Sequence, residues 1–159
     1  MFKRENTTRY HIKNKKVFEF FKKLGMPVGK KKNQVMKIPA ELIQSRQLTK
    51  SFIRGVWGAD GTMYRRYSKK YANHKKIYLY INLQLKMKAP VLINQIDKFL
   101  REEGIKTNRI TEDRKKNAVV LRITHQKAVQ RFVEIIGFSN PRYAKKFKDL
   151  STEPKARGS

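Results

Sequence analysis

The sequence predicts an α+β fold: a four-stranded antiparallel sheet with helices packed on one of its faces. The strongest observation is the segment 76–88, KIYLYINLQLKMK, in which apolar and polar residues alternate almost perfectly, as in a half-buried strand. The segments 105–111 and 117–125 read as two further strands, and the charged turn EDRKKN between them predicts a hairpin. Amphipathic helical patterns over 90–103 and 126–136 alternate with these strands, which is typical of an α+β domain.

The N-terminal part of the chain predicts two helices and a basic connection. Residues 17–24 place apolar side chains on one helical face, and Gly25 with Pro27 ends that helix. A basic segment follows, and Pro39 then opens a short helix with the sequence PAELIQSRQL. The predicted domain organisation has three parts, which are a helical and basic extension packed on the core (1–48), the core itself (49–150) and a C-terminal tail (151–159).

The stretch 49–64, TKSFIRGVWGADGTMY, begins as a helix and leads into a strand, TMYRRYSKK. Small residues at positions 55, 58 and 59 fall on one helical face, which allows a second helix to approach closely. If that helix belongs to a second copy of the chain, two-fold symmetry brings Asp60 and its symmetry mate together. Paired carboxylates can hold Mg²⁺ beside a scissile phosphate. The alternative interpretations are a kinked helix and a plain Asp-Gly turn.

The charge of the chain indicates a polyanionic partner. Lys and Arg number 39 against 12 Asp and Glu, a net charge of +27. Phosphate neutralisation favours nucleic acid, and a membrane surface is the weaker interpretation because no basic run joins an amphipathic terminal helix. The absence of cysteine excludes disulfides and cysteine zinc sites, and the three histidines form no ligand-spaced pair. Without a signal core or a long apolar run, we expect a soluble, cytoplasmic protein with no membrane partner.

The nine residues 53–61, IRGVWGADG, resemble the signature motif of the LAGLIDADG homing endonucleases, in the form FLRGxFDADGxx common in archaeal intron- and intein-encoded members. The upstream segment GMPVGKKKNQVMKIPAELI is also similar to archaeal members, and the predicted order αββαββα matches the family core. The resemblance covers roughly residues 10–150. A single motif per chain implies a homodimer that packs through the motif helices. The implied interface residues are Phe52, Gly55, Val56, Gly58 and Ala59.

The resemblance also implies a magnesium site, at which Ca²⁺ could substitute without cleavage. Asp60 stands at the position of the family's metal-binding catalytic aspartate. The carbonyl of Ala59 stands where a backbone oxygen often completes the metal shell, and Gly58 replaces an acid that many members carry.

Basic residues complete the active site that the resemblance implies, because they position water and stabilise the phosphorane. Lys88 is the best match, with Lys86 next. In the last loop, SNPRYAKK, Tyr143 stands where the family often has a further lysine after an Asn/His-Pro pair. The residues that could substitute are Arg142, Lys145 and Lys146, of which Lys145 is the candidate. The alternative for all these lysines is a plain phosphate contact.

The family lays its antiparallel sheet in the major groove, so the polar faces of the predicted strands are the expected DNA interface. The first two strands carry no acid, whereas an ordinary solvated sheet, which is the alternative, normally carries Glu. Loop lysines suit phosphate contacts. The expected DNA contacts are Thr62, Tyr64, Arg66, Ser68, Lys70, Tyr78, Tyr80, Asn82, Gln84, Lys86, Thr107, Arg109, Thr111, Arg122 and Thr124 on the strands, with Lys30 and Lys31 in a loop.

These implications define a site-specific double-strand DNA endonuclease that recognises a long near-palindromic site and hydrolyses phosphodiesters with a divalent metal. One alternative is a non-cleaving member that acts as an intron RNA maturase or a DNA-binding regulator. Another is a ribosomal or other structural RNA-binding protein, which the charge alone would suggest. That alternative leaves the glycine-rich helix face and Asp60 unexplained.

Overall fold

The computed structural model describes residues 13–23, 35–67 and 79–151 of the chain, which divides into two compact units, Met1–Gln34 and Val35–Ser159. The described part of the first unit is the helix α1 (Lys15–Lys23). It starts two residues earlier than the apolar pattern predicts because the side chain of Asn14 accepts hydrogen bonds from the first backbone N–H groups of the helix.

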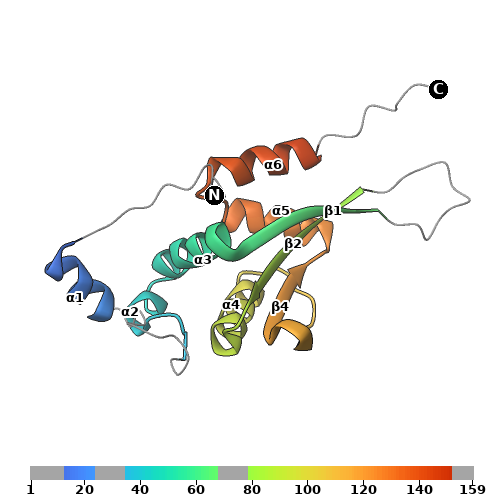
Figure 1. Cartoon of the computed structure of the whole chain (residues 1–159). Helices are drawn as coiled ribbons and strands as arrows, with labels where there is room; N and C mark the ends of the chain where they lie inside the picture. Colours follow the sequence, from blue (N-terminus) through green and yellow to red (C-terminus); the bar gives the residue numbers. More distant parts are fainter. Residues whose placement is uncertain (1–12, 24–34, 68–78, 152–159) are drawn as a thin grey trace, which may run out of the picture. The chain divides into compact units, whose positions relative to one another are not determined.

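The second unit alternates helices and strands in the predicted order, and the α+β fold class is confirmed (Figure 1). Figure 1 shows α3 running directly into β1, so the helix and the strand share one continuous stretch of backbone. The elements are α2 (Ala40–Ile43), α3 (Arg46–Asp60), β1 (Gly61–Tyr67), β2 (Leu79–Met87), α4 (Pro90–Glu102), β3 (Thr111–Asp113), the 3₁₀ turn η2 (Arg114–Lys116), β4 (Ala118–Ile123), α5 (Gln126–Ile135) and α6 (Pro141–Ser151).

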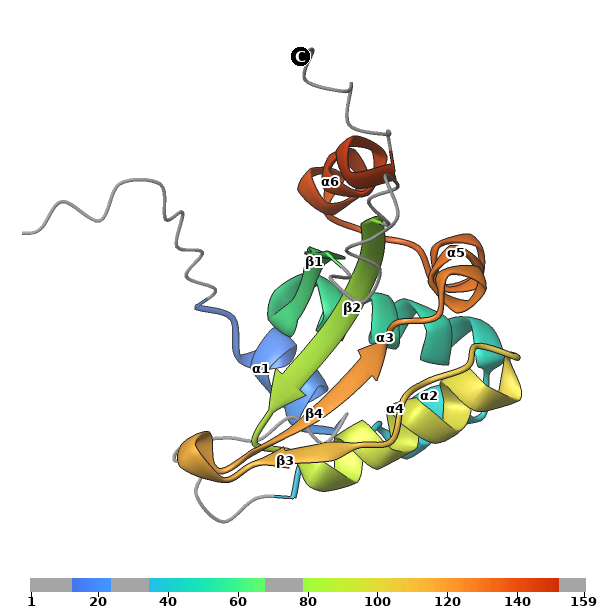
Figure 2. The same cartoon turned by 90° about the vertical axis from the view of Figure 1, so that its right-hand side faces the viewer.

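The four strands form one antiparallel sheet in the order β1-β2-β4-β3. The register pairs Met63 with Leu83 and Leu85 with Leu121, so these side chains share a face. All four are buried on that face, against which α3, α4 and α5 pack (Figure 2). The opposite face carries the polar half of the alternating pattern and is the face that the helices leave uncovered.

The core between the sheet and the helices contains large side chains from each layer. Trp57 of α3 lies against Phe132 of α5, with ring centroids 4.6 Å apart. Ile96 and Leu100 of α4 are completely buried in the same cluster. Burial of a large apolar side chain stabilises a fold by roughly 1.5–3 kcal/mol, so this layer fixes the orientation of α3 above the sheet.

The strand predicted over 105–111 is wrong for most of its length, because β3 begins only at Thr111. The preceding segment lies against α4 instead. Ile105 is fully buried, and the hydroxyl of Thr107 donates a hydrogen bond to Asp97 of α4. A side chain held by the helix keeps the segment out of the ladder, and the backbone N–H of Asn108 makes a separate hydrogen bond to the Arg122 carbonyl.

The short helix expected to begin at Pro39 is also wrong in its extent, because it stops at Ile43 after one turn. Ser45 then has an extended backbone, and its hydroxyl accepts a hydrogen bond from the Leu48 N–H, which starts α3. From Arg46 to Asp60 the helix is continuous through both internal glycines, so neither glycine ends it.

Candidate metal site and nucleic-acid interface

The motif helix α3 buries one face and exposes the other. Thr49, Ile53 and Trp57 recur at the spacing of one helical face and are buried. Gly55 and Ala59 lie on the exposed side, and a Cβ atom added to Gly55 would have no neighbour within 4 Å. The outward surface of α3 is therefore flat and open near its C-terminal end.

The other predicted interface residues lie beside this surface. Phe52 and Val56 are half-buried and pack against the edge of the core. Gly58 turns towards its own chain, because a Cβ atom there would lie 3.2 Å from the Ser139 hydroxyl. The open surface of α3 thus comprises Gly55 and Ala59 with Phe52 and Val56 at its margin, and Gly58 serves the packing of α3 against the turn before α6.

Asp60 is the last residue of α3, and its side chain is exposed. Within the described residues its carboxylate has no hydrogen bond or ion pair, and no group of three or more His, Asp or Glu side chains lies close enough to hold a metal ion. The Ala59 carbonyl is adjacent in the chain. One copy of the described chain therefore offers a single carboxylate at this point.

The backbone immediately after Asp60 is tightly constrained. Gly61 bonds through its N–H to the Trp57 carbonyl, and a Cβ atom at Gly61 would lie 2.3 Å from both the Trp57 ring and that carbonyl. The φ of Gly61 is −75°, which any residue adopts, so the need for glycine here is steric.

Residues expected at the DNA interface share the polar face of the sheet. The register places Thr62 opposite Gln84 and Tyr64 opposite Asn82, and α3 lies behind them on the other face. Tyr64 is exposed, whereas Asn82 is 2% exposed, which leaves almost none of its side chain accessible to DNA. Further pairs on this face are Arg66 with Tyr80, Gln84 with Arg122, and Lys86 and Thr111 with Val120.

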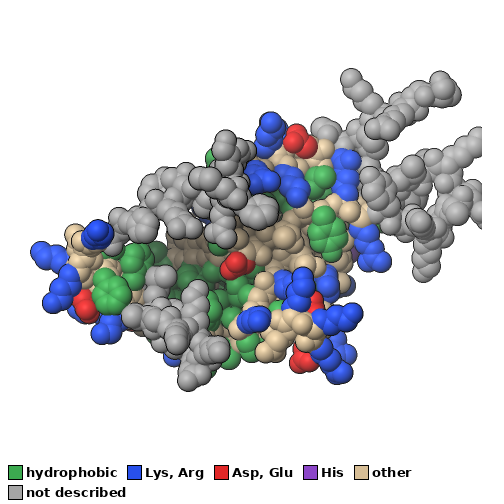
Figure 3. Space-filling view, viewed as in Figure 1, with side chains coloured by type: hydrophobic (Ala, Val, Ile, Leu, Met, Phe, Trp, Pro, Cys, Tyr) green, Lys and Arg blue, Asp and Glu red, His purple; other side chains and the backbone are tan. Residues whose placement is uncertain are grey.

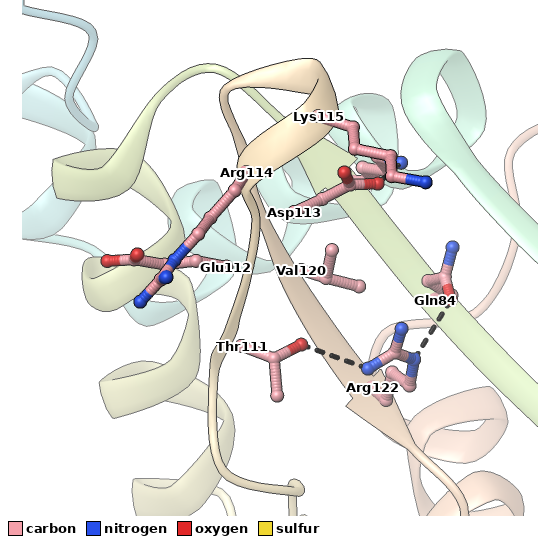
Figure 4. Close-up of a pocket in the computed structure, with 9 residues that line it drawn as sticks. Gln84, Thr111, Glu112, Asp113, Arg114, Lys115, Val120 and Arg122 are labelled. Atoms are coloured by element: carbon pink, nitrogen blue, oxygen red, sulfur yellow. Dashed lines mark hydrogen bonds and ion pairs between the residues drawn. The ribbon is translucent and has the colours of Figure 1, made fainter.

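A side-chain network crosses three strands on this face. The Arg122 guanidinium of β4 donates through Nε to Gln84 Oε1 of β2 at 3.0 Å, and through Nη1 to Thr111 Oγ1 of β3 at 3.0 Å (Figure 4). The two bonds hold the guanidinium in one place over β4, which is one of the two central strands. Within the described residues its Nη2 makes no hydrogen bond and its Nη1 makes one, which leaves three of the five N–H donors for a ligand.

Lys86 lies in an open cavity of about 470 Å³ at the end of the same face, and its ammonium forms an ion pair with Asp113. The hydrogen bond from Lys86, followed by one from the backbone N–H of Lys116, holds the pKa of the Asp113 carboxyl below its ordinary value. Glu112 and Arg122 line the same cavity. The positive charge of Lys86 is thus partly neutralised in this structure.

The other two candidate lysines are exposed and have no ion pair within the described residues. Lys88 follows β2, and Lys145 lies on the outer side of α6. No hydrogen bond joins Asp60 to Lys86, Lys88 or Lys145 in the described part of the chain. The lysine that would act beside Asp60 stays a prediction.

Three of the expected DNA contacts that the structure describes lie off the strands. Thr107 is 6% exposed and bonded to α4, so we correct its assignment to the sheet face: its hydroxyl stabilises the fold. Arg109 is exposed but precedes β3. Thr124, just after β4, donates from its hydroxyl to the Asn108 side chain at 3.0 Å. Five expected contacts lie outside the described residues, namely Lys30, Lys31, Ser68, Lys70 and Tyr78.

Sequence reasoning missed the contact between Tyr143 and the motif. The Tyr143 hydroxyl of α6 donates a 2.6 Å hydrogen bond to the Gly61 carbonyl, 82 residues earlier in the chain. A contact of this sequence separation has no local signal. The only indication was a tyrosine at a position where a lysine was expected.

Basic side chains dominate the described surface. Figure 3 shows Lys and Arg side chains spread over the face turned to the viewer, with few acidic side chains among them. Each of the described helices is too short or too polar to cross a membrane.

The second unit thus combines an αββαββα order, a polar sheet face and an exposed aspartate where its first long helix meets the sheet. A family model described as a LAGLIDADG-like domain matches residues 47–137, which is more than half of the chain. The chain therefore belongs to the LAGLIDADG family. No curated protein matches it.

Solved structures share the fold at low sequence identity. The homing endonuclease I-CvuI, solved in complex with the I-CreI target in the presence of 2 mM Mg with the DNA not cleaved, is 14% identical over 65% of this chain and 64% of its own, with a TM-score of 0.54. I-SmaMI, bound to uncleaved DNA target in the presence of calcium ions, is 12% identical over 86% of this chain and 43% of its own, with a TM-score of 0.50. The archaeal intron-encoded I-Vdi141I, complexed with DNA, is 17% identical over 64% of this chain and 58% of its own, with a TM-score of 0.48. This chain therefore matches less than two thirds of each of these proteins.

Proposed function

We propose that this chain is a homodimeric, site-specific double-strand DNA endonuclease of the single-motif, archaeal type, which reads a long near-palindromic site and hydrolyses phosphodiesters with a divalent metal. The observation that carries the proposal is Asp60, an exposed carboxylate without a partner in the described chain, at the end of a helix whose adjoining surface is open. Membership of the family and solved relatives bound to target DNA support it.

The dimer is proposed because one chain supplies too few ligands. Two copies of α3 that pack through Gly55 and Ala59 would bring two Asp60 carboxylates to the symmetry axis. The match to I-SmaMI supports two copies of this chain per active unit, since 86% of this chain corresponds to only 43% of that protein. The residues of α3 would thus provide both the contact between copies and the acid pair.

The donor set at the end of α3 fits magnesium. Mg²⁺ takes hard oxygen ligands, often one or two carboxylates together with phosphate oxygens, and Asp60 and the Ala59 carbonyl are such donors. When bound, the metal would supply charge stabilisation at the phosphate and activation of water. Ca²⁺, which takes oxygen ligands too, would bind without supporting cleavage. I-CvuI was solved with target DNA in the presence of 2 mM Mg in one structure and of 2 mM Ca in another.

The polar sheet face is proposed as the DNA-reading surface. Two-stranded and larger β surfaces fit the major groove, where each base pair shows a distinct set of donors and acceptors. Arg122, Gln84 and Thr62 would contact base edges from this face, while exposed Lys88 and Lys145 would contact phosphates or complete the active site. The net charge of +27 would steer the protein to DNA and make binding strongly dependent on salt.

The second candidate function is a non-cleaving relative that acts as an intron RNA maturase or a DNA-binding regulator. The pairing of Lys86 with Asp113 favours it, because the carboxylate neutralises the charge of one of the two best lysine candidates. Tyr143 in place of the expected lysine points the same way.

The first test measures cleavage of a plasmid with Mg²⁺ and, separately, with Ca²⁺. The plasmid carries the host gene without its intron or intein, so that the two sequences flanking the endonuclease coding region are joined directly. We expect double-strand cutting with Mg²⁺ alone, binding with both metals, and no cutting by Asp60→Asn. Binding by the wild-type protein without any cutting would favour the maturase or regulator. Absence of sequence-specific binding to that DNA would overturn both DNA functions.

The second test measures the dimer by sedimentation. Gly55→Leu places a large side chain on the open surface of α3, so we expect dissociation to monomer. The monomer should remain folded, because a Cβ at Gly55 meets no atom within 4 Å. Lys98→Leu, which adds the same side chain to an exposed position of α4, is the matched control and should stay dimeric. A wild-type protein that is monomeric at working concentration would contradict the proposed assembly.

A further inference from the structure

We propose that Tyr143 is a positioning residue that fixes the direction of Asp60 by holding the Gly61 carbonyl. The inference rests on the proposed function, in which Asp60 is the metal-binding acid. Its structural basis is the 2.6 Å hydrogen bond from the Tyr143 hydroxyl to the carbonyl of the residue directly after Asp60.

Asp60 needs such support because its side chain has none of its own. The carboxylate is exposed and has no hydrogen bond or ion pair within the described residues, so its direction depends on the backbone that carries it. That backbone is held at two points. Trp57 packs beneath Gly61 and accepts its N–H, and Tyr143 binds its carbonyl.

Tyr143 is itself anchored at both ends of its helix. Its ring stacks on Phe138 at 5.8 Å between centroids. Asn140, directly before α6, accepts a hydrogen bond from the Arg142 N–H through its side chain at 2.9 Å. At the other end, the Arg65 guanidinium of β1 donates to the Leu150 carbonyl, with bonds of 2.7 and 3.1 Å. The hydroxyl of Tyr143 is therefore presented by a helix docked on the same strand that follows Asp60.

This anchor lies outside the residues matched by the family model. The match ends at 137, whereas α6 spans Pro141–Ser151. Tyr143 thus adds to the family core a support that this chain builds from its own C-terminal helix. The phenol hydroxyl bonds to the carbonyl of Gly61 and not to Asp60, so its effect on the carboxylate passes through the backbone of Gly61.

The physical expectation is a small effect on stability and a large effect on the rate. One hydrogen bond to a carbonyl is a minor part of the stability of α6, which is also held by Arg65 and by aromatic packing. A displacement of about 1 Å in a reacting group lowers a rate by roughly 100-fold. A merely structural role would instead lower stability, DNA affinity and rate together.

The experiment compares Tyr143→Phe with Ser151→Ala. The first removes the hydroxyl and keeps the stacking ring. The second removes another hydroxyl of α6 that donates to a backbone carbonyl, that of Phe147 at 2.7 Å, without touching Gly61. Both proteins are measured without metal or DNA by amide hydrogen exchange at Gly61, and then by single-turnover cleavage with Mg²⁺ and DNA affinity with Ca²⁺.

We expect exchange at Gly61 to rise about tenfold or more in Tyr143→Phe and to stay unchanged in Ser151→Ala. We expect the cleavage rate of Tyr143→Phe to fall by about 10- to 100-fold while its DNA affinity stays within about twofold of the wild type. Unchanged exchange at Gly61, or a rate that falls only in parallel with affinity and melting temperature, would overturn the inference. A wild-type protein that does not cut refutes the endonuclease instead, and the exchange comparison still decides whether Tyr143 holds this backbone.

Discussion

Arg122 Nε donates a 3.0 Å hydrogen bond to Gln84 Oε1 across the two central strands of the sheet. The same guanidinium is held from the other side by Thr111. An arginine fixed in this way loses little side-chain entropy when it binds, and the remaining N–H groups of its Nη1 and Nη2 suit the paired acceptors of guanine, N7 and O6.

The first prediction concerns base selectivity. In a selection from randomised duplex DNA with Ca²⁺, we expect the wild-type protein to fix guanine at one position of each half-site, and Arg122→Ala to lose that preference. A bidentate arginine–guanine contact discriminates by about 1–3 kcal/mol, and replacing that guanine with 7-deazaguanine should weaken the wild type only. Gln84→Ala should relax the same position, because it frees the guanidinium.

Thr124→Ala is the control for this selection. Thr124 contacts Asn108 and does not contact Arg122, so the guanine position should stay fixed. If Arg122→Ala instead weakens all sequences equally, the guanidinium contacts a phosphate and the proposed base readout at this position is incorrect.

The second prediction concerns the Lys86–Asp113 ion pair. Asp113→Asn removes the partner that neutralises Lys86, so we expect tighter DNA binding and a steeper salt dependence. One additional phosphate contact changes the slope of log K against log salt by about 0.9. Glu112→Gln makes the same change of charge at the next residue, which has no ion pair within the described chain, and should change the slope less. Equal slopes in the two variants would show that Lys86 gains no phosphate contact.

The third prediction compares two glycines of the same motif. Gly61→Ala should destabilise the protein by about 1–3 kcal/mol, because its Cβ would overlap the Trp57 ring and carbonyl. Gly55→Ala should stabilise the monomer by up to about 1 kcal/mol, because alanine favours the helix and its Cβ meets open space. Urea denaturation in dilute protein measures both. A similar loss of stability in the two variants would contradict the steric explanation.

The fourth prediction concerns the acid sensitivity of the contact between α3 and α4. Hydrogen bonds from Lys50 and then Arg46 lower the pKa of Glu103 from an ordinary value of 4.5. A lowered pKa in the folded state stabilises the protein above the unfolded pKa, and this contribution disappears as the pH falls through the folded value. The stability difference between the wild type and Glu103→Gln should therefore be constant near neutral pH and shrink below about pH 4.5.

Denaturation by urea at a series of pH values measures this difference. Glu102→Gln is the control, since Glu102 is exposed and makes no ion pair within the described residues, and it should follow the wild-type profile. A difference that grows towards low pH would contradict the sign of the shift.

Periodic patterns predicted those parts of the fold that are set by one element packing on another. The alternation in 76–88 located β2, and the apolar stripes around Ile96 and Phe132 located α4 and α5. The small face of α3 was also predictable, because helical spacing alone places Gly55 and Ala59 together. These features depend on neighbours in sequence.

Features that depend on a single distant partner were not predictable. The segment before β3 alternates like a strand, but the hydrogen bond from Thr107 to Asp97 attaches it to α4. The sequence alone indicates that Lys86 is an unpaired cation, whereas in the structure the β3–β4 hairpin places Asp113 beside it. Periodicity identifies neither Asp97 nor Asp113 as a partner, because each contact depends on the path of the loop that brings the two residues together.

Trp57 makes the protein intrinsically fluorescent at one defined position. It is the only tryptophan of the chain, it is 1% exposed, and its indole N–H has no hydrogen-bond partner in the described structure. Its ring packs on Gly61, one turn of helix from Asp60, so the fluorescence of the unmodified protein originates beside the proposed metal site. Under the proposed function, a change in this emission on addition of Mg²⁺ would report metal binding beside Asp60 without any added label.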